Sequence, residues 1–470
     1  MSILDTFVNR IAGSVLDGLE VRTEDKQGVE YYKGAQKHQL RVIHGKTDDN
    51  VILNFVGLAV DRSVSKLLHG GIDFKLPEGE EAQAEYLNDL WDVNKKENLL
   101  LQLALNAAIY GTAAIKIIPD GKVNLFTGVS YPRLVAVCPE YLRIITNPQD
   151  IEDVDQYIIE YRIGDISYRE ITRQAQNLTD LESESAEASW IVENYLSSYQ
   201  TKNKWMLVST VQFPYDFPPI LHWKNLPSIN DVYGTSDIAN IIGIQDKTNF
   251  IASNIAKIIR LHAHPQIWGR NISGNLEQVE LGPDKVIKVQ GDTAGLFNLE
   301  MSSDLGSSRT FFTDLRQSLF DVVREIDITS ITDRIGSLTN FGLRVLNGDA
   351  LAKNDTKRQL MGDALLELNR RLLVIGGYTD ERSRPGQIIW HDPLPVDEIS
   401  RLSAQQIELS MGTVSKQTIA EENGRNWEEE NKRILDEQAA SGNLGGALLT
   451  SPTMELTKAF TRTMPKAKAG

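Results

Sequence analysis

The sequence predicts an α+β protein, in which helices and strands both contribute but dominate different stretches of the chain. Helical and strand patterns occur together in the first half, two long helical patterns flank a compact module in the middle, and helical patterns dominate the C-terminal region. The 470 residues are 41% apolar and 24% charged, which is the composition of a globular protein that can bury a sizeable core.

The N-terminal half contains most of the predicted strands. Apolar residues at helical spacing over residues 1–22 predict a docking helix rather than a signal peptide. Further helices are predicted over residues 50–68, 80–91 and 97–110. Strands are predicted over residues 112–118, 135–137, 157–161 and 205–211, with a turn at Asn147-Pro148, an exposed acidic loop over 178–189 and an extended proline-rich segment over 214–223.

A long helix is predicted from Thr235 to the residue before Pro265. Thr235, Ser236 and Asp237 are suitable N-cap residues, and isoleucines recur at spacings of three and four along one face. A small module with strands over 276–281 and 286–289 follows, and a second amphipathic helix is predicted over 309–328. The two helices therefore form a hairpin with a compact module at its tip.

The C-terminal region is mainly helical. A flexible run over 329–340 precedes a long helical region over 341–375, and a strand is predicted over 387–390. Two short helices follow, of which the second is strongly acidic. The tail over 441–470 is rich in glycine, serine, threonine and lysine, and this composition predicts disorder.

Charge, cysteine content and hydropathy exclude several classes of protein. The formal net charge of −15 argues against a conventional DNA-wrapping protein, although it leaves room for a local basic patch. Cys138 is the single cysteine, so no intrachain disulfide forms. The uncharged run over 99–115 is too short and too polar for a membrane span, and a buried helix that runs into a strand explains it better. No membrane association is expected.

No catalytic or metal-binding constellation emerges from the motifs. The HGKT sequence at 44–47 ends like a phosphate-binding loop, but Leu40 occupies the position where that motif requires glycine. His262 and His264 have no cysteine or carboxylate nearby to complete a metal shell. Glu325, Asp327 and Asp333 form a loose acidic group, for which a solvated face is favoured over a magnesium site. We therefore expect no catalytic residue, metal or cofactor.

Several ordered segments resemble the portal proteins of tailed double-stranded DNA phages, in particular the large family of long-tailed-phage portals. The resemblance covers most of the chain and rests on the order and spacing of its segments. These are YYKGAQ at 31–36, the stretch 54–61 with the following LLHGGIDF, AAIYGTAAIKI at 107–117, GTSDIANIIGIQDKTN at 234–249 and GTVSKQTIAEENGRNWEEENKRI at 412–434.

The resemblance implies a portal-type ring subunit with a mixed α/β wing, a two-helix stem, a small β-containing clip and an α-helical crown. The implied regions are an N-terminal wing region over residues 1–234, stem helix 235–264, clip 265–308, stem helix 309–328, tunnel loop 329–340, a C-terminal wing region with its long helix over residues 341–393, crown 394–440 and a flexible basic tail 441–470. The loop sequence GSLTNFGL departs from the small Ser-Gly-x-Ala pattern that is common in the family.

The same resemblance implies the partners and the location of the chain. It implies a homo-oligomeric ring, usually of twelve subunits, at the capsid portal vertex of the virion, assembled in the host cytoplasm. Double-stranded DNA would pass through the channel, and a terminase or packaging ATPase and later a head-completion adaptor would dock on the ring. Major capsid and scaffolding proteins are further implied partners.

Candidate contact residues follow from these placements. A ring multiplies every inward side chain by the number of subunits, so a channel that lets DNA slide needs few cations per chain. The DNA-channel candidates are Lys257, Arg260, Arg334, Ser337, Thr339 and Asn340, and the clip partner-binding candidates are Trp268, Arg270 and Asn271. For the cations, pairing with carboxylates of a neighbouring subunit is an equal alternative.

Two other functional classes stay open on the sequence. A nucleotide-driven DNA-packaging enzyme of the terminase type is disfavoured by the broken phosphate-loop motif and the missing metal constellation. Another phage head or tail structural protein is the second alternative, although a hairpin with a module at its tip is not expected of a shell protein.

Overall fold

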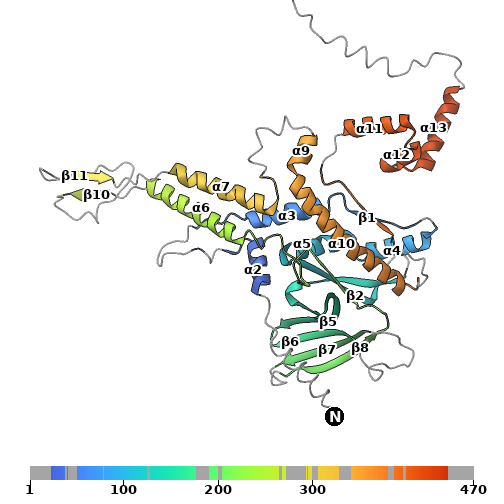
Figure 1. Ribbon diagram of the computed structural model, residues 1–470, viewed down its shortest axis with the longest axis horizontal. Coiled ribbons are helices and arrows are strands. Elements are labelled where there is room, and N and C mark those ends of the chain that lie inside the picture. Colours follow the sequence, from blue (N-terminus) through green and yellow to red (C-terminus); the bar gives the residue numbers. More distant parts are fainter. Residues whose placement is uncertain are drawn as a thin grey trace, which may run out of the picture. The chain divides into compact units, whose positions relative to one another are not determined.

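The computed structural model divides the chain into two compact units, Met1–Leu394 and Pro395–Gly470. Elements of both units carry the labels of Figure 1. The described residues are 23–36, 40, 50–77, 79–123, 128–175, 190–198, 204–263, 267–270, 293, 295–298, 305–327, 340–378, 386–394 and 398–442.

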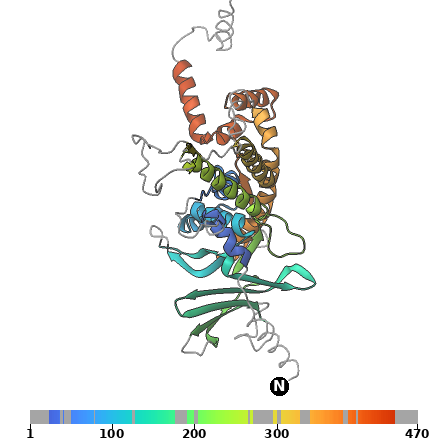
Figure 2. The same cartoon turned by 90° about the vertical axis from the view of Figure 1, so that its left-hand side faces the viewer.

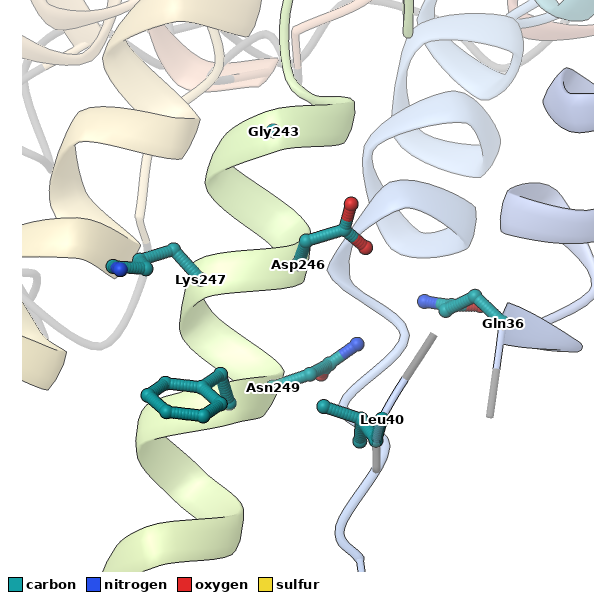
Figure 3. Close-up of a pocket in the computed structure, with 7 residues that line it drawn as sticks. Gln36, Leu40, Gly243, Asp246, Lys247 and Asn249 are labelled. Carbon is teal, nitrogen blue, oxygen red and sulfur yellow. The ribbon is translucent and has the colours of Figure 1, made fainter. Parts of the chain in front are cut away.

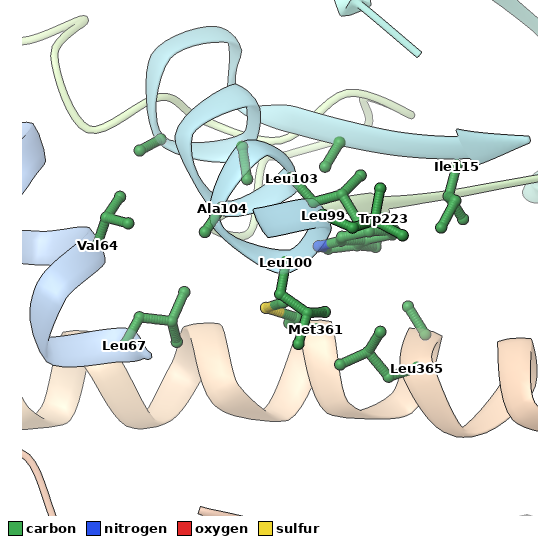
Figure 4. Close-up of a cluster of buried hydrophobic side chains, with 14 of the residues drawn as sticks. Val64, Leu67, Leu99, Leu100, Leu103, Ala104, Ile115, Trp223, Met361 and Leu365 are labelled. Carbon is green, nitrogen blue, oxygen red and sulfur yellow. The ribbon is translucent and has the colours of Figure 1, made fainter. Parts of the chain in front are cut away.

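The core of the first unit is built from helices that pack around α5 (Lys96–Tyr110). In Figure 4, Leu100 of α5 lies against Met361 of α10 (Gly348–Ile375), while Val64 and Leu67 of α3 (Phe55–Leu67) lie beside them. Helices α2 (Thr23–Tyr32) and α4 (Glu81–Val93) complete this helical layer, and α9 (Asn340–Leu346) precedes α10 in the chain. The run of uncharged residues in α5 is thereby explained, because the helix is covered by other helices and by a sheet.

Two antiparallel sheets lie on one side of this helical core (Figure 2). In the first, β2 (Thr112–Val123) lies between β3 (Ser130–Val137) and β9 (Ile220–Lys224). The second has the order β4-β5-β6-β7-β8. Its strands are β4 (Leu142–Asn147), β5 (Asp150–Ile163), β6 (Ile166–Gln174), β7 (Trp190–Ser198) and β8 (Met206–Phe213). A short 3-10 helix, η2 (Pro139–Tyr141), links the two sheets.

A two-stranded ribbon closes the first unit across a large sequence separation. Strand β1 (Ile72–Lys75) pairs antiparallel with β12 (Gln387–Trp390), with Ile72 opposite Trp390. The predicted strand over 387–390 has the bounds of β12, and this prediction is confirmed.

The predicted hairpin is present, with different helix ends. Helix α6 (Ile242–Ala263) and helix α7 (Leu305–Val323) lie side by side and project from the body of the first unit, as Figure 1 shows. Strand β10 (Ile267–Arg270) pairs antiparallel with β11 (Gly295–Asn298) at the tip. The predicted starts near Thr235 and Arg309 and the predicted end of the second helix at residue 328 are wrong.

The second unit is helical in its described residues. It contains α11 (Glu398–Met411), α12 (Lys416–Glu422) and α13 (Trp427–Gly442), where the sequence predicted two helices. The Ser415 hydroxyl accepts a hydrogen bond of 3.1 Å from the backbone N–H of Thr418, which caps α12.

The α+β class is confirmed, and so are the helices predicted over 80–91 and 97–110, whereas the helix predicted over 50–68 is present as α3 but begins at Phe55, so its predicted start is wrong. The helix over 1–22, the loop over 178–189, the strands over 276–281 and 286–289 and the tail beyond 442 lie outside the described residues.

Candidate functional site

Many polar contacts hold the base of the α6–α7 hairpin together. The segment leading into α6 runs against the end of α5, where Gly111 has a φ of +84°. Asn225 donates its backbone N–H to the Gly111 carbonyl at 2.8 Å, and Asp237 donates to the Ala108 carbonyl at 2.9 Å. Gly234 passes so close to Gly111 that a Cβ on either glycine would meet the backbone of the other. The segment is therefore held in place before the helix begins.

Asp237 is a buried counterion rather than a helix cap. Its carboxylate is fully buried, and it pairs with Lys353 at 3.1 Å and with Lys357 on α10. Lys357 also donates to the Ser63 hydroxyl at 2.8 Å, which brings α3 into the same cluster. Burial by itself raises the pKa of the Asp237 carboxyl, but Lys357 and Lys353 outweigh it and hold that pKa below its usual range. Asp237 was predicted as a helix cap, but in the structure it connects the segment leading into α6 with α10 and, through Lys357, with α3.

Helix α6 is held against the extended segment before α3 by three polar side chains. Gln245 donates to the Leu53 carbonyl at 2.5 Å, and Asn249 accepts from the Leu53 N–H at 2.9 Å. The Ser253 hydroxyl accepts from the Val51 N–H at 3.0 Å. These side chains satisfy backbone groups of a segment that has no strand partner among the described residues, so the first turns of α6 are fixed to the body of the unit.

A cavity of about 250 Å³ opens on this face of α6. Figure 3 shows Asp246, Asn249 and Gln36 pointing toward the same space, while Lys247 points to the other side of the helix. Asp246 accepts a hydrogen bond of 2.6 Å from the hydroxyl of Tyr31. Gln36 is 1% exposed, and neither polar atom of its side chain has a hydrogen-bond partner among the described residues. A polar cavity of this volume can hold ordered water molecules.

Helix α7 ends at the same base in a Schellman motif. The backbone N–H of Arg324 bonds to the Asp321 carbonyl at 3.1 Å, and that of Glu325 bonds to the Phe320 carbonyl at 2.9 Å. Arg324 has a φ of +63°, so an arginine occupies the left-handed position that glycine normally takes in this motif.

Replacing Arg324 by glycine is expected to raise the free energy of unfolding by about 1 kcal/mol, because the left-handed backbone conformation costs glycine no steric strain. Urea unfolding of the wild-type and Arg324→Gly proteins measures this difference. Gly377, which has a φ of +88° after α10 and no atom within 4 Å of a built Cβ, offers the matched control. The Gly377→Arg protein should lose about the same amount, and equal stability of all three proteins would contradict the strain argument.

The three residues after Arg324 are each bound to a different side chain. Glu325 pairs with Lys66 of α3 at 2.5 Å, and Asp327 pairs with Arg316 of α7 at 2.8 Å. The Ile326 carbonyl accepts a hydrogen bond of 3.0 Å from the Arg62 guanidinium. The solvated acidic face that the sequence favoured is therefore wrong for Glu325, whose side chain is 3% exposed, while Asp333 lies outside the described residues.

Some of the candidate contact residues lie within the described part of the chain. Lys257 lies on α6 and donates to the Asn50 side chain at 3.3 Å, and Arg260 is exposed on the same helix. Arg270 is exposed in β10, which also contains Trp268, and Asn340 begins α9. The remaining candidates, Arg334, Ser337, Thr339 and Asn271, lie outside the described residues. The structure therefore does not test which of these residues line a channel or bind a partner.

The described residues contain no group of three or more potential metal ligands. Within the same residues, no helix has the length and apolar character needed to cross a membrane. His262 lies in the last turns of α6, whereas His264 and the HGKT sequence lie outside the described residues.

Sequence reasoning missed the residues that build the base of the hairpin. Asp237, Arg324, Lys353 and Lys357 are drawn together from separate helices and loops, and no local spacing indicates that. The one available signal is the GTSD sequence at 234–237, which carries the family resemblance but which short-range rules assign to a helix cap.

Comparison with known proteins gives one match, which spans most of the chain and includes the base of the α6–α7 hairpin. A family model described as "Phage portal protein, SPP1 Gp6-like" matches residues 21–443. No curated protein sequence matches the chain.

Proposed function

Since the chain belongs to the SPP1 Gp6-like phage portal protein family, we propose that it assembles into a ring-shaped channel at one capsid vertex. Family membership makes it a portal protein of a tailed-phage virion with a role in genome packaging. In the proposal, DNA enters and later leaves the capsid through the ring, which has a structural rather than an enzymatic role.

The observation that carries the proposal is the projecting α6–α7 hairpin with its exposed apolar residues. Phe250 and Ile259 on α6 are 49% and 53% exposed, and Phe311 on α7 is 45% exposed. Apolar side chains that stay exposed on both helices of a projecting hairpin favour burial against another protein surface. Head-to-tail contacts between copies close into a ring when their rotation divides a full turn, and the hairpins would then pack side by side.

The proposal assigns each region of the subunit a place in the ring. Residues 1–234 and 341–393 form the wing, 235–264 and 309–328 the stem, 265–308 the clip, 329–340 the tunnel loop, 394–440 the crown and 441–470 a basic tail. The clip, with Trp268, Arg270 and Asn271, would bind the packaging ATPase and later the head-completion adaptor. Assembly in the host cytoplasm with scaffolding and major capsid proteins would precede packaging.

The channel candidates contribute a small number of cations to each subunit. These are Lys257, Arg260 and Arg334, with Ser337, Thr339 and Asn340 as neutral contacts. Each phosphate that a cation neutralises steepens the salt dependence of DNA binding, so a sparse set would let the duplex move through the ring.

Electron microscopy of the purified full-length protein tests the proposal. We expect closed rings with a central hole wide enough for a DNA duplex, of twelve subunits if the usual stoichiometry holds. Replacing Phe311 with aspartate should abolish the rings, because it places a charge on the apolar contact face, while the monomer stays folded. Ile229 is 92% exposed in a loop, so the Ile229→Asp protein is the matched control and should form rings.

Two outcomes would contradict the proposal. Monomers or dimers that persist at high concentration and across salt conditions would favour another head or tail protein. ATP hydrolysis above background, with no rings, would favour a packaging enzyme.

A further inference from the structure

The helix ends of this protein show that Arg324 occupies a glycine position. Four other described helices end in the same Schellman hydrogen-bond pattern as α7, and each of them has glycine at the left-handed residue. Those residues are Gly34, Gly377, Gly412 and Gly424, with φ between +70° and +88°. Only α7, among these described helix ends, has a side chain at that position. A strained residue that could be glycine suggests that its side chain is used.

Arg324 is exposed, and it is one of the residues that line a cavity of about 350 Å³ between the segment leading into α6, the end of α7 and α10. Lys353 lines the same cavity, and its side chain is only 7% exposed. Its ammonium group donates to Asp237 at 3.1 Å and to the Val323 carbonyl at 3.0 Å, which leaves its third N–H without a partner among the described residues. That N–H is therefore available to an acceptor in the cavity.

The charges around the cavity favour an anion. Asp237 is the one carboxylate among the described lining residues, and Lys353 and Lys357 already share it. The nearby Glu325 is paired with Lys66. Lys353 and Lys357 carry two positive charges against the single carboxylate of Asp237, while the pair of Glu325 and Lys66 adds no net charge. Arg324 adds a further positive charge, so the groups around the cavity have a net positive charge.

We propose that this cavity is a phosphate-binding site at the base of the hairpin. The Arg324 guanidinium would hold two oxygens of the anion in a fork, and the free N–H of Lys353 would donate to a third. Ser236 and Asn240 line the cavity as well, and they supply a hydroxyl and an amide that can donate. The ligand is either free inorganic phosphate or a phosphate group of nucleic acid, since the recognition chemistry is the same.

The described residues that follow α7 end at residue 327, three positions after Arg324. A bound phosphate would neutralise the cavity and hold the end of α7 to α10 through one ligand. This inference does not depend on ring formation, because phosphate binding can be measured whether or not the protein forms a channel.

Isothermal titration of the full-length protein with sodium phosphate, at an ionic strength matched with sodium chloride, is the first test. We expect one phosphate per chain and an affinity that falls about tenfold or more in the Arg324→Gly protein, because a charge-assisted pair is lost. The Arg324→Lys protein keeps the charge and should retain most of the binding. Arg133 is exposed on β3 away from the cavity, so the Arg133→Gln protein is the control and should bind like the wild type.

Duplex DNA in place of phosphate distinguishes the two sources. If DNA is the source, Arg324→Gly weakens retention of the duplex and lowers the salt slope by about 0.9 for each lost phosphate contact. Unchanged DNA retention together with lost phosphate binding assigns the site to free phosphate. The proposal is overturned if the wild type binds no phosphate, or if the Arg324→Gly protein binds it equally well.

Discussion

Replacing Asp237 with asparagine is expected to lower the free energy of unfolding by about 4 kcal/mol. The change removes the negative charge that Lys353 and Lys357 share, and both lysine side chains are at most 7% exposed. Two buried ammonium groups without a counterion cost far more than one lost hydrogen bond. Urea unfolding monitored by circular dichroism gives the difference.

Two further proteins decide whether charge is the cause. Asp92 is exposed on α4, so the Asp92→Asn protein should differ from the wild type by less than about 0.5 kcal/mol. Converting both lysines to methionine in the Asp237→Asn background should recover most of the loss, because no unpaired charge then remains buried. A triple variant as unstable as the single one would show that packing, and not charge, sets the effect.

The pH dependence of stability should change in the same variant. The folded pKa of Asp237 is below its unfolded value, so its contribution is present above the unfolded pKa of about 3.9 and is lost as the pH falls through the folded pKa. In the acid range the wild type should therefore lose its advantage over Asp237→Asn as the pH is lowered. An advantage of constant size down to the acid transition would contradict this assignment.

The fold could be predicted where local pattern and burial agree. The helices predicted between residues 50 and 110 have apolar patterns that match the faces they bury, and in the strand Gln387–Trp390 the side chains of Ile388 and Trp390 pack against the core while Ile389 stays 43% exposed. Strands β6 and β7 were missed, and in β6 the charged residues Arg169, Glu170 and Arg173 interrupt the apolar pattern. The β6 arginines are satisfied across the sheet instead, as in the pair Arg173–Glu193 at 2.9 Å. Cross-strand pairing depends on register, which a single strand does not reveal.

The base of the hairpin could not be predicted for a related reason. Asp237 follows two other good N-cap residues, so short-range rules assign it to the start of a helix. Its partners lie on α10, more than a hundred positions later, and only the tertiary fold brings them within reach. Arg324 was likewise invisible, because a left-handed arginine leaves no composition signal. The resemblance to portal proteins identified the GTSD segment, but not what its aspartate contacts.

The second large effect is expected at Gly111, where alanine should lower the free energy of unfolding by about 4 kcal/mol or more. A Cβ at this residue would lie 2.3 Å from the Gly234 carbonyl oxygen and 2.9 Å from the Ser236 nitrogen. Both are backbone atoms, so no side-chain rotation relieves the overlap. The φ of +84° adds the strain of a left-handed alanine. Urea unfolding of the wild-type and Gly111→Ala proteins measures the loss.

The matched control separates backbone strain from the steric clash. Gly164 has a φ of +60° and no atom within 4 Å of a built Cβ, so the Gly164→Ala protein should lose only about 1 kcal/mol. If Gly111→Ala loses no more than this, the contact with Gly234 is not a constraint. A larger loss would come with displacement of Asp237, because its backbone N–H bonds to Ala108 in the turn of α5 just before Gly111. We therefore expect the Gly111→Ala and Asp237→Asn effects to be less than additive, since the first change already disturbs the ion pairs that the second removes.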